Sequence, residues 1–160
     1  MPGAGRAQHR TMRELTCPSP FGPLTIGESD GRIAALRWGG DAGDESELLD
    51  EAARQLADYF DGSRKAFDLP IGYRPGLQGQ VMRAMVAIPF GETRTYGDLS
   101  KALGFPAQAV GQACGANPVP IIVPCHRILG ASGLGGFSAP GGVETKVALL
   151  RHEGAASLLI

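Results

Sequence analysis

The sequence has few cysteines, few aromatic residues and no long apolar run, and it carries almost no net charge. Three cysteines in 160 residues are too few and too scattered for a disulfide scaffold, and their odd number is typical of free thiols in a reducing compartment. No apolar run approaches the roughly 18 residues that a membrane span needs, so we expect no membrane partner. The formal net charge of −1 excludes a strongly basic nucleic-acid coat over the whole chain.

What remains is an ordinary globular composition, with 43% apolar and 19% charged residues. The first residues contain Arg6 and Arg10 but no apolar segment of a secretory signal, so we predict a disordered leader over 1–13. Charge is uneven along the chain: residues 1–75 hold 12 acids and 9 bases, whereas 76–160 hold 4 acids and 6 bases. The second half is therefore compatible with a polyanionic partner.

The first half predicts a small α/β domain over 14–74. Two short apolar runs, 24–28 and 33–38, are joined through Asp30-Gly31, a pair typical of a tight hairpin. An apolar stripe at helical spacing predicts a helix over 47–60, capped by Ser46 and closed by Gly62. One more strand is expected over 66–71 and a linker over 72–76.

The second half, 75–160, predicts mostly helices. They are expected over 77–88, 96–103, 107–114 and 143–152. The last should turn Val143, Val147 and Leu150 inward. Thr95-x-x-Asp98 is a capping-box start, Gly104 a stop and Pro106 a suitable first-turn residue, so the middle pair fits a helix-turn-helix. Any buried helical pair gives a similar pattern.

A candidate reactive site is Pro124-Cys125-His126-Arg127. It follows the β-branched run 121–123, which predicts a buried strand, and precedes a Gly/Ser-rich loop over 130–142. A histidine can lower the pKa of a nearby thiol or take its proton. Adjacent residues of an extended chain point to opposite sides, so a bend or a bridging water is required. The alternative is a small buried cysteine beside a satisfied histidine.

Residues 117–129, Asn-Pro-Val-Pro-Ile-Ile-Val-Pro-Cys-His-Arg-Ile-Leu, resemble the active-site signature of the O6-alkylguanine-DNA alkyltransferases, also called methylated-DNA–protein-cysteine methyltransferases. The resemblance extends through Leu77-Gln78, 88–97, Lys146 and 152–154, and into 19–24 and 58–60. It implies an α+β fold: a small ribonuclease H-like α/β lobe, then a mostly helical winged helix-turn-helix lobe that carries the active site.

The resemblance also implies residue roles. Cys125 would accept the alkyl group, His126 would activate it through a water, and Glu153 would orient His126. Asn117 would tie the helix-turn-helix to the active-site loop, and Tyr96 would contact the lesion and help protonate the leaving guanine. The residues implied to contact substrate or DNA are Ala107, Gln108, Ala109, Gly111, Arg127, Phe137 and Ser138, the last hydrogen-bonding O6.

The implied partner is double-stranded DNA containing O6-alkylguanine, bound through the minor groove without sequence preference by a cytoplasmic monomer. The target nucleotide must be flipped out, because O6 is stacked and paired in the duplex. Small residues over 107–113 suit a close approach to the backbone. No metal and no cofactor are implied. Cys17 has no Cys or His at ligand spacing. The S-alkylcysteine product should form once per molecule.

The sequence departs from the family in three places. Gln108 stands where an arginine usually replaces the flipped base, after a short turn over 104–106. Phe137 stands where a tyrosine is common, and Ala139-Pro140 is an insertion that makes the match of Ser138 less certain. Two other functions remain open. One is a lesion-binding relative with little transfer activity, although such proteins lack the cysteine, and the other is a cysteine hydrolase.

Overall fold

The computed structural model describes residues 12–131, 133–135, 137 and 139–155. The chain divides into two compact units, 1–72 and 73–160, and the division falls within the segment predicted as a linker. Among the described residues, none of the helices is both long and apolar enough to cross a membrane.

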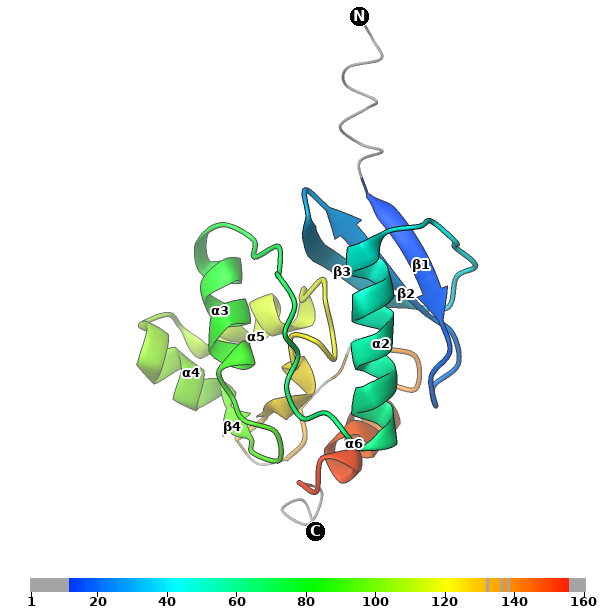
Figure 1. Cartoon of the computed structure of the whole chain (residues 1–160). Helices are drawn as coiled ribbons and strands as arrows, with labels where there is room; N and C mark the ends of the chain where they lie inside the picture. The colour runs from blue at the N-terminus through cyan, green and yellow to red at the C-terminus, as the bar shows by residue number, and fades with distance from the viewer. Residues whose placement is uncertain (1–11, 132, 136, 138, 156–160) are drawn as a thin grey trace, which may run out of the picture. The chain divides into compact units, whose positions relative to one another are not determined.

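The first unit is a three-stranded antiparallel sheet with one helix packed against it (Figure 1). Strands β1 (Arg13–Cys17), β2 (Leu24–Ser29) and β3 (Arg32–Trp38) lie in that order, and α2 (Glu47–Asp61) follows. Asp30 and Gly31 both have positive φ, 53° and 72°, as a tight hairpin turn requires. The core of this unit is formed by fully buried side chains of the sheet and helix, among them Leu24, Ile26, Ile33, Leu49, Ala52 and Tyr59.

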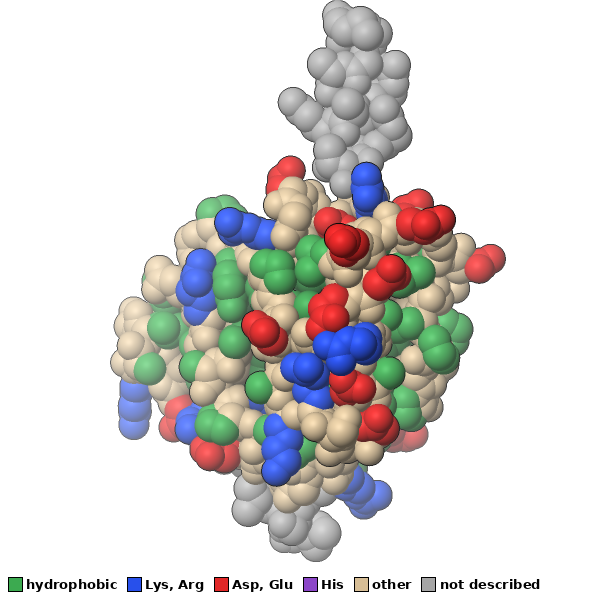
Figure 2. All heavy atoms as spheres, in the orientation of Figure 1, with side chains coloured by type: hydrophobic (Ala, Val, Ile, Leu, Met, Phe, Trp, Pro, Cys, Tyr) green, Lys and Arg blue, Asp and Glu red, His purple; other side chains and the backbone are tan. Residues whose placement is uncertain are grey.

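Helix α2 has the predicted caps. The side chain of Ser46 accepts a hydrogen bond from the Leu49 amide, and Gly62 ends the helix with φ 90°. Figure 2 shows acidic and basic side chains interspersed over α2, where Arg54 pairs with Glu51 and with Asp58.

In this unit the bound of one prediction moves by one residue, and another prediction is wrong. Strand β1 begins at Arg13, inside the predicted leader, because its backbone pairs with β2 from Arg13↔Glu28 onward; residues 1–11 lie outside the described part. Residues 66–71 form no strand, only an isolated bridge from Ile71 to Ile33. Pro70 has no amide hydrogen to donate, and this segment is held instead by the side chain of Gln55, which bonds both the amide and the carbonyl of Asp68.

The second unit is mostly helical (Figure 1). Its helices are α3 (Gly76–Val86), α4 (Tyr96–Leu103), α5 (Ala107–Gly115) and α6 (Val143–His152). A short 3₁₀ turn, η1 (Cys125–Arg127), precedes β5 (Ile128–Leu129), which pairs in parallel with β4 (Arg94–Thr95). Helices α3, α4 and α5 pack on one another. The buried side chains include Val81, Met82, Met85, Leu99, Val110, Val119, Ile128, Leu149 and Leu150.

The helix-turn-helix pair, α4 and α5, follows its sequence signals. Thr95 and Asp98 form a reciprocal capping box at the start of α4. Gly104 ends α4 with φ 77°, a left-handed conformation that favours glycine. Pro106 is the N-cap of α5, one residue before the helix.

The buried run 121–123 is not the predicted strand. Ile121 has φ 73°, and the Val123 amide bonds back to the Val119 carbonyl, so the chain turns here. The flanking prolines, Pro118, Pro120 and Pro124, lack the amide hydrogens that a strand ladder needs. The run is buried because it is apolar.

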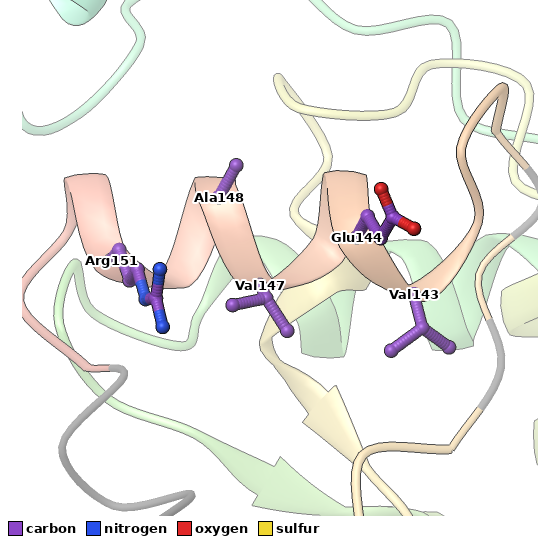
Figure 3. Close-up of a pocket in the computed structure, with 5 residues that line it drawn as sticks. All are labelled: Val143, Glu144, Val147, Ala148 and Arg151. Atoms are coloured by element: carbon purple, nitrogen blue, oxygen red, sulfur yellow. The ribbon is translucent and has the colours of Figure 1, made fainter.

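Helix α6 buries Leu150, as predicted, but Val143 and Val147 are not among its buried residues. Thr145, Lys146, Leu149 and Leu150 are buried, whereas Val143 is 43% exposed. Figure 3 shows Val143, Val147 and Arg151 pointing to the same side of α6, along an open pocket of about 510 Å³ that Glu144 and Ala148 also line. The apolar spacing misled the prediction because a buried lysine occupies the inner face. Neither Cys125 nor His126 lines this pocket.

Candidate active site

Cys125 is the first residue of the 3₁₀ turn η1, between the buried run 121–123 and strand β5. The amide of Cys125 bonds to the Val123 carbonyl, and the Arg127 amide bonds to the Pro124 carbonyl at 3.0 Å. The chain therefore bends at the cysteine, and a bend was one of the two ways, beside a bridging water, in which Cys125 and His126 were expected to interact. Cys125 is half-buried and is a free thiol.

The surroundings of Cys125 keep its thiol protonated at rest. Burial raises its pKa above the ordinary value of 9.0, while a hydrogen bond from Asn117 and the positive charge of Lys146 pull it down. The net shift is upward, so efficient attack by sulfur needs a base that takes the proton.

His126 and Glu153 form a fully buried pair. The Nε2 of His126 lies 2.7 Å from Oε2 of Glu153, which is the C-cap residue of α6. Burial lowers the pKa of His126 below 6.5 against the opposing effect of Glu153. Burial alone would raise the pKa of Glu153, but hydrogen bonds from His126 and Arg127 hold it well below its usual range.

The tautomer of His126 follows from this pairing. An ionised carboxylate can only accept hydrogen bonds, so Nε2 of His126 carries the proton that it donates to Glu153. The other ring nitrogen, Nδ1, is buried and has no hydrogen-bond partner among the described residues. In neutral His126 that nitrogen carries the basic lone pair.

Asn117 links the end of α5 to the segment before Cys125. Its Nδ2 donates to the Val123 carbonyl at 2.8 Å, and its Oδ1 accepts from the Val119 amide at 3.1 Å. Both bonds hold the turn that presents the cysteine. Asn117 therefore joins the residues that follow α5 to the segment that carries Cys125.

Tyr96 lies at the start of α4 and is half-buried. Burial raises its pKa above 10.0, and the nearby thiols Cys114 and Cys125 raise it further, so the phenol is protonated at neutral pH. A β-carbon built on Gly111 would lie 3.9 Å from the Tyr96 ring, and one on Gly135 would lie 3.3 Å from it. Gly135 also has φ 72°, so both its space and its backbone favour glycine.

Lys146 is a functional candidate whose burial was not predicted from the sequence. Its side chain has no exposed surface, and Nζ donates to the carbonyls of Ile128, at 2.6 Å, and Leu134. Burial lowers its pKa to about 8. The lysine joins α6 to the chain that follows the cysteine and places a positive charge near Cys125. Its appearance in the family resemblance was the available signal.

The predicted DNA-contact residues differ in their exposure. Ala107 and Gln108 are exposed on the first turn of α5, Ala109 and Phe137 are half-buried, and Gly111 faces Tyr96. Ser138 lies outside the described residues.

Arg127 is where the structure disagrees with the prediction. It is 6% exposed, and its guanidinium is bonded to Glu153 and to the Ile88 carbonyl. An interior guanidinium held in this way does not present itself to DNA, because its donors face buried acceptors.

The described residues hold no group of three or more His, Cys, Asp or Glu side chains that could bind a metal ion. What the second unit brings together is a thiol, a histidine with one basic ring nitrogen, a buried carboxylate and a helix-turn-helix. This defines a protein with a cysteine nucleophile on a nucleic-acid-binding scaffold.

Comparison with known families makes the assignment specific. Residues 12–73 match the 6-O-methylguanine DNA methyltransferase ribonuclease-like domain, and residues 76–155 match the DNA-binding domain of the same proteins. The chain belongs to the 6-O-methylguanine DNA methyltransferase family.

Curated relatives and solved structures support the same family. The methylated-DNA–protein-cysteine methyltransferase of Mycobacterium tuberculosis is 41% identical over 86% of this chain and 90% of its own length. The constitutive Bacillus subtilis protein of that name is 39% identical over 86% and 93%. The crystal structure of the Mycobacterium tuberculosis protein in complex with DNA superposes with a TM-score of 0.78 at 38% identity, covering 90% of this chain and 94% of that one.

Proposed function

We propose that this protein repairs O6-alkylguanine in double-stranded DNA by transferring the alkyl group to Sγ of Cys125, once per molecule. The observation that carries the proposal is the His126–Glu153 pair, fully buried and joined at 2.7 Å, directly beside Cys125 in a segment that matches the family's DNA-binding domain. Transfer forms a carbon–sulfur bond and breaks the bond from carbon to O6, whose electron pair stays on guanine. The thioether has no second nucleophile to cleave it, so the reaction is irreversible.

The base that primes the sulfur is His126. Because Glu153 holds the Nε2 proton, Nδ1 is the nitrogen that takes the thiol proton, through one bridging water. The imidazolium that forms is stabilised by Glu153, as in other triads that end in a carboxylate. This order of events fits a thiol whose pKa burial has raised.

Tyr96 serves the leaving group. Its phenol is protonated at neutral pH and lies near Cys125. It can therefore donate a hydrogen bond to the guanine, on which negative charge develops as the bond from carbon to O6 breaks. Gly111 and Gly135 give the ring its space. The chemistry requires no metal and no cofactor, because sulfur is the acceptor and guanine the leaving group.

DNA is bound through α5, which enters the minor groove without reading sequence. The first turn of this helix exposes Ala107 and Gln108, small or neutral side chains that allow a close approach to the backbone. Gln108 fills the space that the flipped nucleotide leaves. We place the protein as a monomer in the cytoplasm, where cysteines remain reduced.

A stoichiometric transfer assay tests the proposal. A duplex with a radiolabelled O6-methylguanine is incubated with the wild-type chain, Cys125→Ala and Cys114→Ala, a second thiol of the same unit. Wild type and Cys114→Ala should each take up one label per molecule, and Cys125→Ala none, while keeping its fold and its affinity for DNA. Label on Cys125→Ala, or continued turnover as in a hydrolase, would overturn the proposal.

A further inference from the structure

Arg127 is bonded on every side inside the second unit. Its Nε donates to Oε1 of Glu153 at 2.8 Å, Nη2 donates to Oε2 of Glu153 at 2.9 Å, and Nη1 donates to the Ile88 carbonyl at 2.6 Å. The ring of Phe90 lies 5.9 Å from the guanidinium carbon. This planar cation thus fixes both oxygens of Glu153 in one orientation.

The same carboxylate oxygen serves two donors. Oε2 of Glu153 meets Nη2 of Arg127 and Nε2 of His126, so Arg127 fixes the oxygen to which His126 donates. Glu153 also ends α6, where the helix dipole disfavours a negative charge. A buried carboxylate at that position needs a permanent cation to stay ionised, and Arg127 supplies it.

We propose that Arg127 is a positioning residue for alkyl transfer: it keeps Glu153 ionised and oriented, so that His126 stays neutral with Nδ1 as its basic nitrogen. This inference rests on the proposed function. Arg127 touches neither substrate nor the reacting sulfur in this role. It acts on the thiol through Glu153 and His126, and its interior location leaves it no part in binding DNA.

The charges around His126 give the direction of the effect. Glu153 favours the protonated ring, whereas Arg127, from its own turn, and Lys146, from α6, disfavour it; Cys125 precedes it in the chain. Without the Arg127 charge, the buried Glu153 carboxylate must take its counter-charge from His126, so His126 should protonate at higher pH. A protonated His126 cannot take the thiol proton, so the acid limb of the transfer rate should move upward as well.

The experiment has two readouts on the full chain. The first is the titration of His126 by ¹⁵N NMR of histidine-labelled protein without substrate. Wild type should titrate below pH 6.5 with Nε2 protonated, and Arg127→Met should titrate about one pH unit higher or more. The second is the rate of alkyl transfer from free O6-alkylguanine against pH, which avoids any change in DNA binding. Its acid limb should shift by the same amount in Arg127→Met.

Two further variants keep the test decisive if Arg127→Met fails to fold. Arg127→Lys keeps the charge but loses the two-point contact, so His126 should titrate as in wild type while transfer slows on the order of tenfold to 10²-fold. Arg151→Met removes an exposed arginine of α6 and should change neither readout.

An unchanged His126 titration in Arg127→Met, a rate loss equal at every pH, or a wild-type rate in Arg127→Lys would each overturn the inference. A wild-type chain that accepts no alkyl group would overturn the proposed function instead, while the NMR titration would still test Arg127.

Discussion

Replacing Lys146 with methionine should change how stability depends on pH. The pKa of Lys146 falls from 10.5 to about 8 because the ammonium is buried. A lysine whose pKa is lower in the folded chain than in the unfolded chain destabilises the fold at any pH where it is protonated in both. That penalty is present at pH 7 and disappears as the pH rises from about 8 toward 10.5. The difference between the two pKa values makes the penalty about 3 kcal/mol at pH 7, of which about 2–3 kcal/mol is relieved by pH 10.

The assay is urea unfolding of wild type and Lys146→Met under reducing conditions at several pH values from 7 to 10. Methionine has no titratable group, and it leaves the carbonyls of Ile128 and Leu134 without this donor at every pH. The stability of wild type relative to the variant should therefore grow by about 2–3 kcal/mol across that range. The thiols titrate in both proteins, so the difference between their free energies of unfolding removes most of the thiol contribution. A difference that stays constant with pH would refute the argument that Lys146 is buried as a cation.

Three other changes test the site. Glu153→Gln should slow transfer by about 10²-fold at neutral pH, and the rate should recover only at pH values above the ordinary thiol pKa of 9.0, where Cys125 ionises without a base; a rate that stays low at high pH would contradict this. Gly135→Ala should displace Tyr96 and slow transfer, whereas the control Gly133→Ala, whose added carbon meets nothing within 4 Å, should be silent; equal rates for both would remove Tyr96 from the account. Gln108→Arg should speed repair of duplex more than reaction with free alkylguanine, because arginine adds charge-assisted bonds of about 1–2 kcal/mol; equal effects on the two substrates would show that position 108 fills no gap in the duplex.

Local signals in the sequence predicted the local structure well. The caps at Ser46 and Thr95 and the left-handed glycines Gly62 and Gly104 depend on a few neighbouring residues, and the structure has them where they were predicted. Pairings between distant segments were missed. Strands β4 and β5 are two residues each and exist only because Arg94 meets Ile128 across 34 positions of sequence, which no short pattern reveals.

The candidate site was predicted only in part, because its motif is local whereas the burial of two of its side chains depends on distant segments. The Pro-Cys-His-Arg motif and its resemblance to a family brought together residues that the fold indeed places side by side, with Glu153 against His126. Arginine and lysine side chains are almost never fully buried unless they are paired, so the sequence favoured an exposed position for both Arg127 and Lys146. Their burial depends on partners from other elements, the Glu153 carboxylate and the Ile128 and Leu134 carbonyls.

The most direct test of the account is the mass of the intact protein after incubation with excess duplex that contains O6-methylguanine, followed by peptide mapping. Single transfer to Cys125 predicts a gain of one methyl group per chain, located on Cys125, with no further gain at longer times and an equal amount of restored guanine in the DNA. A methyl group on Cys17 or Cys114, or restoration of more lesions than there are protein molecules, would contradict it.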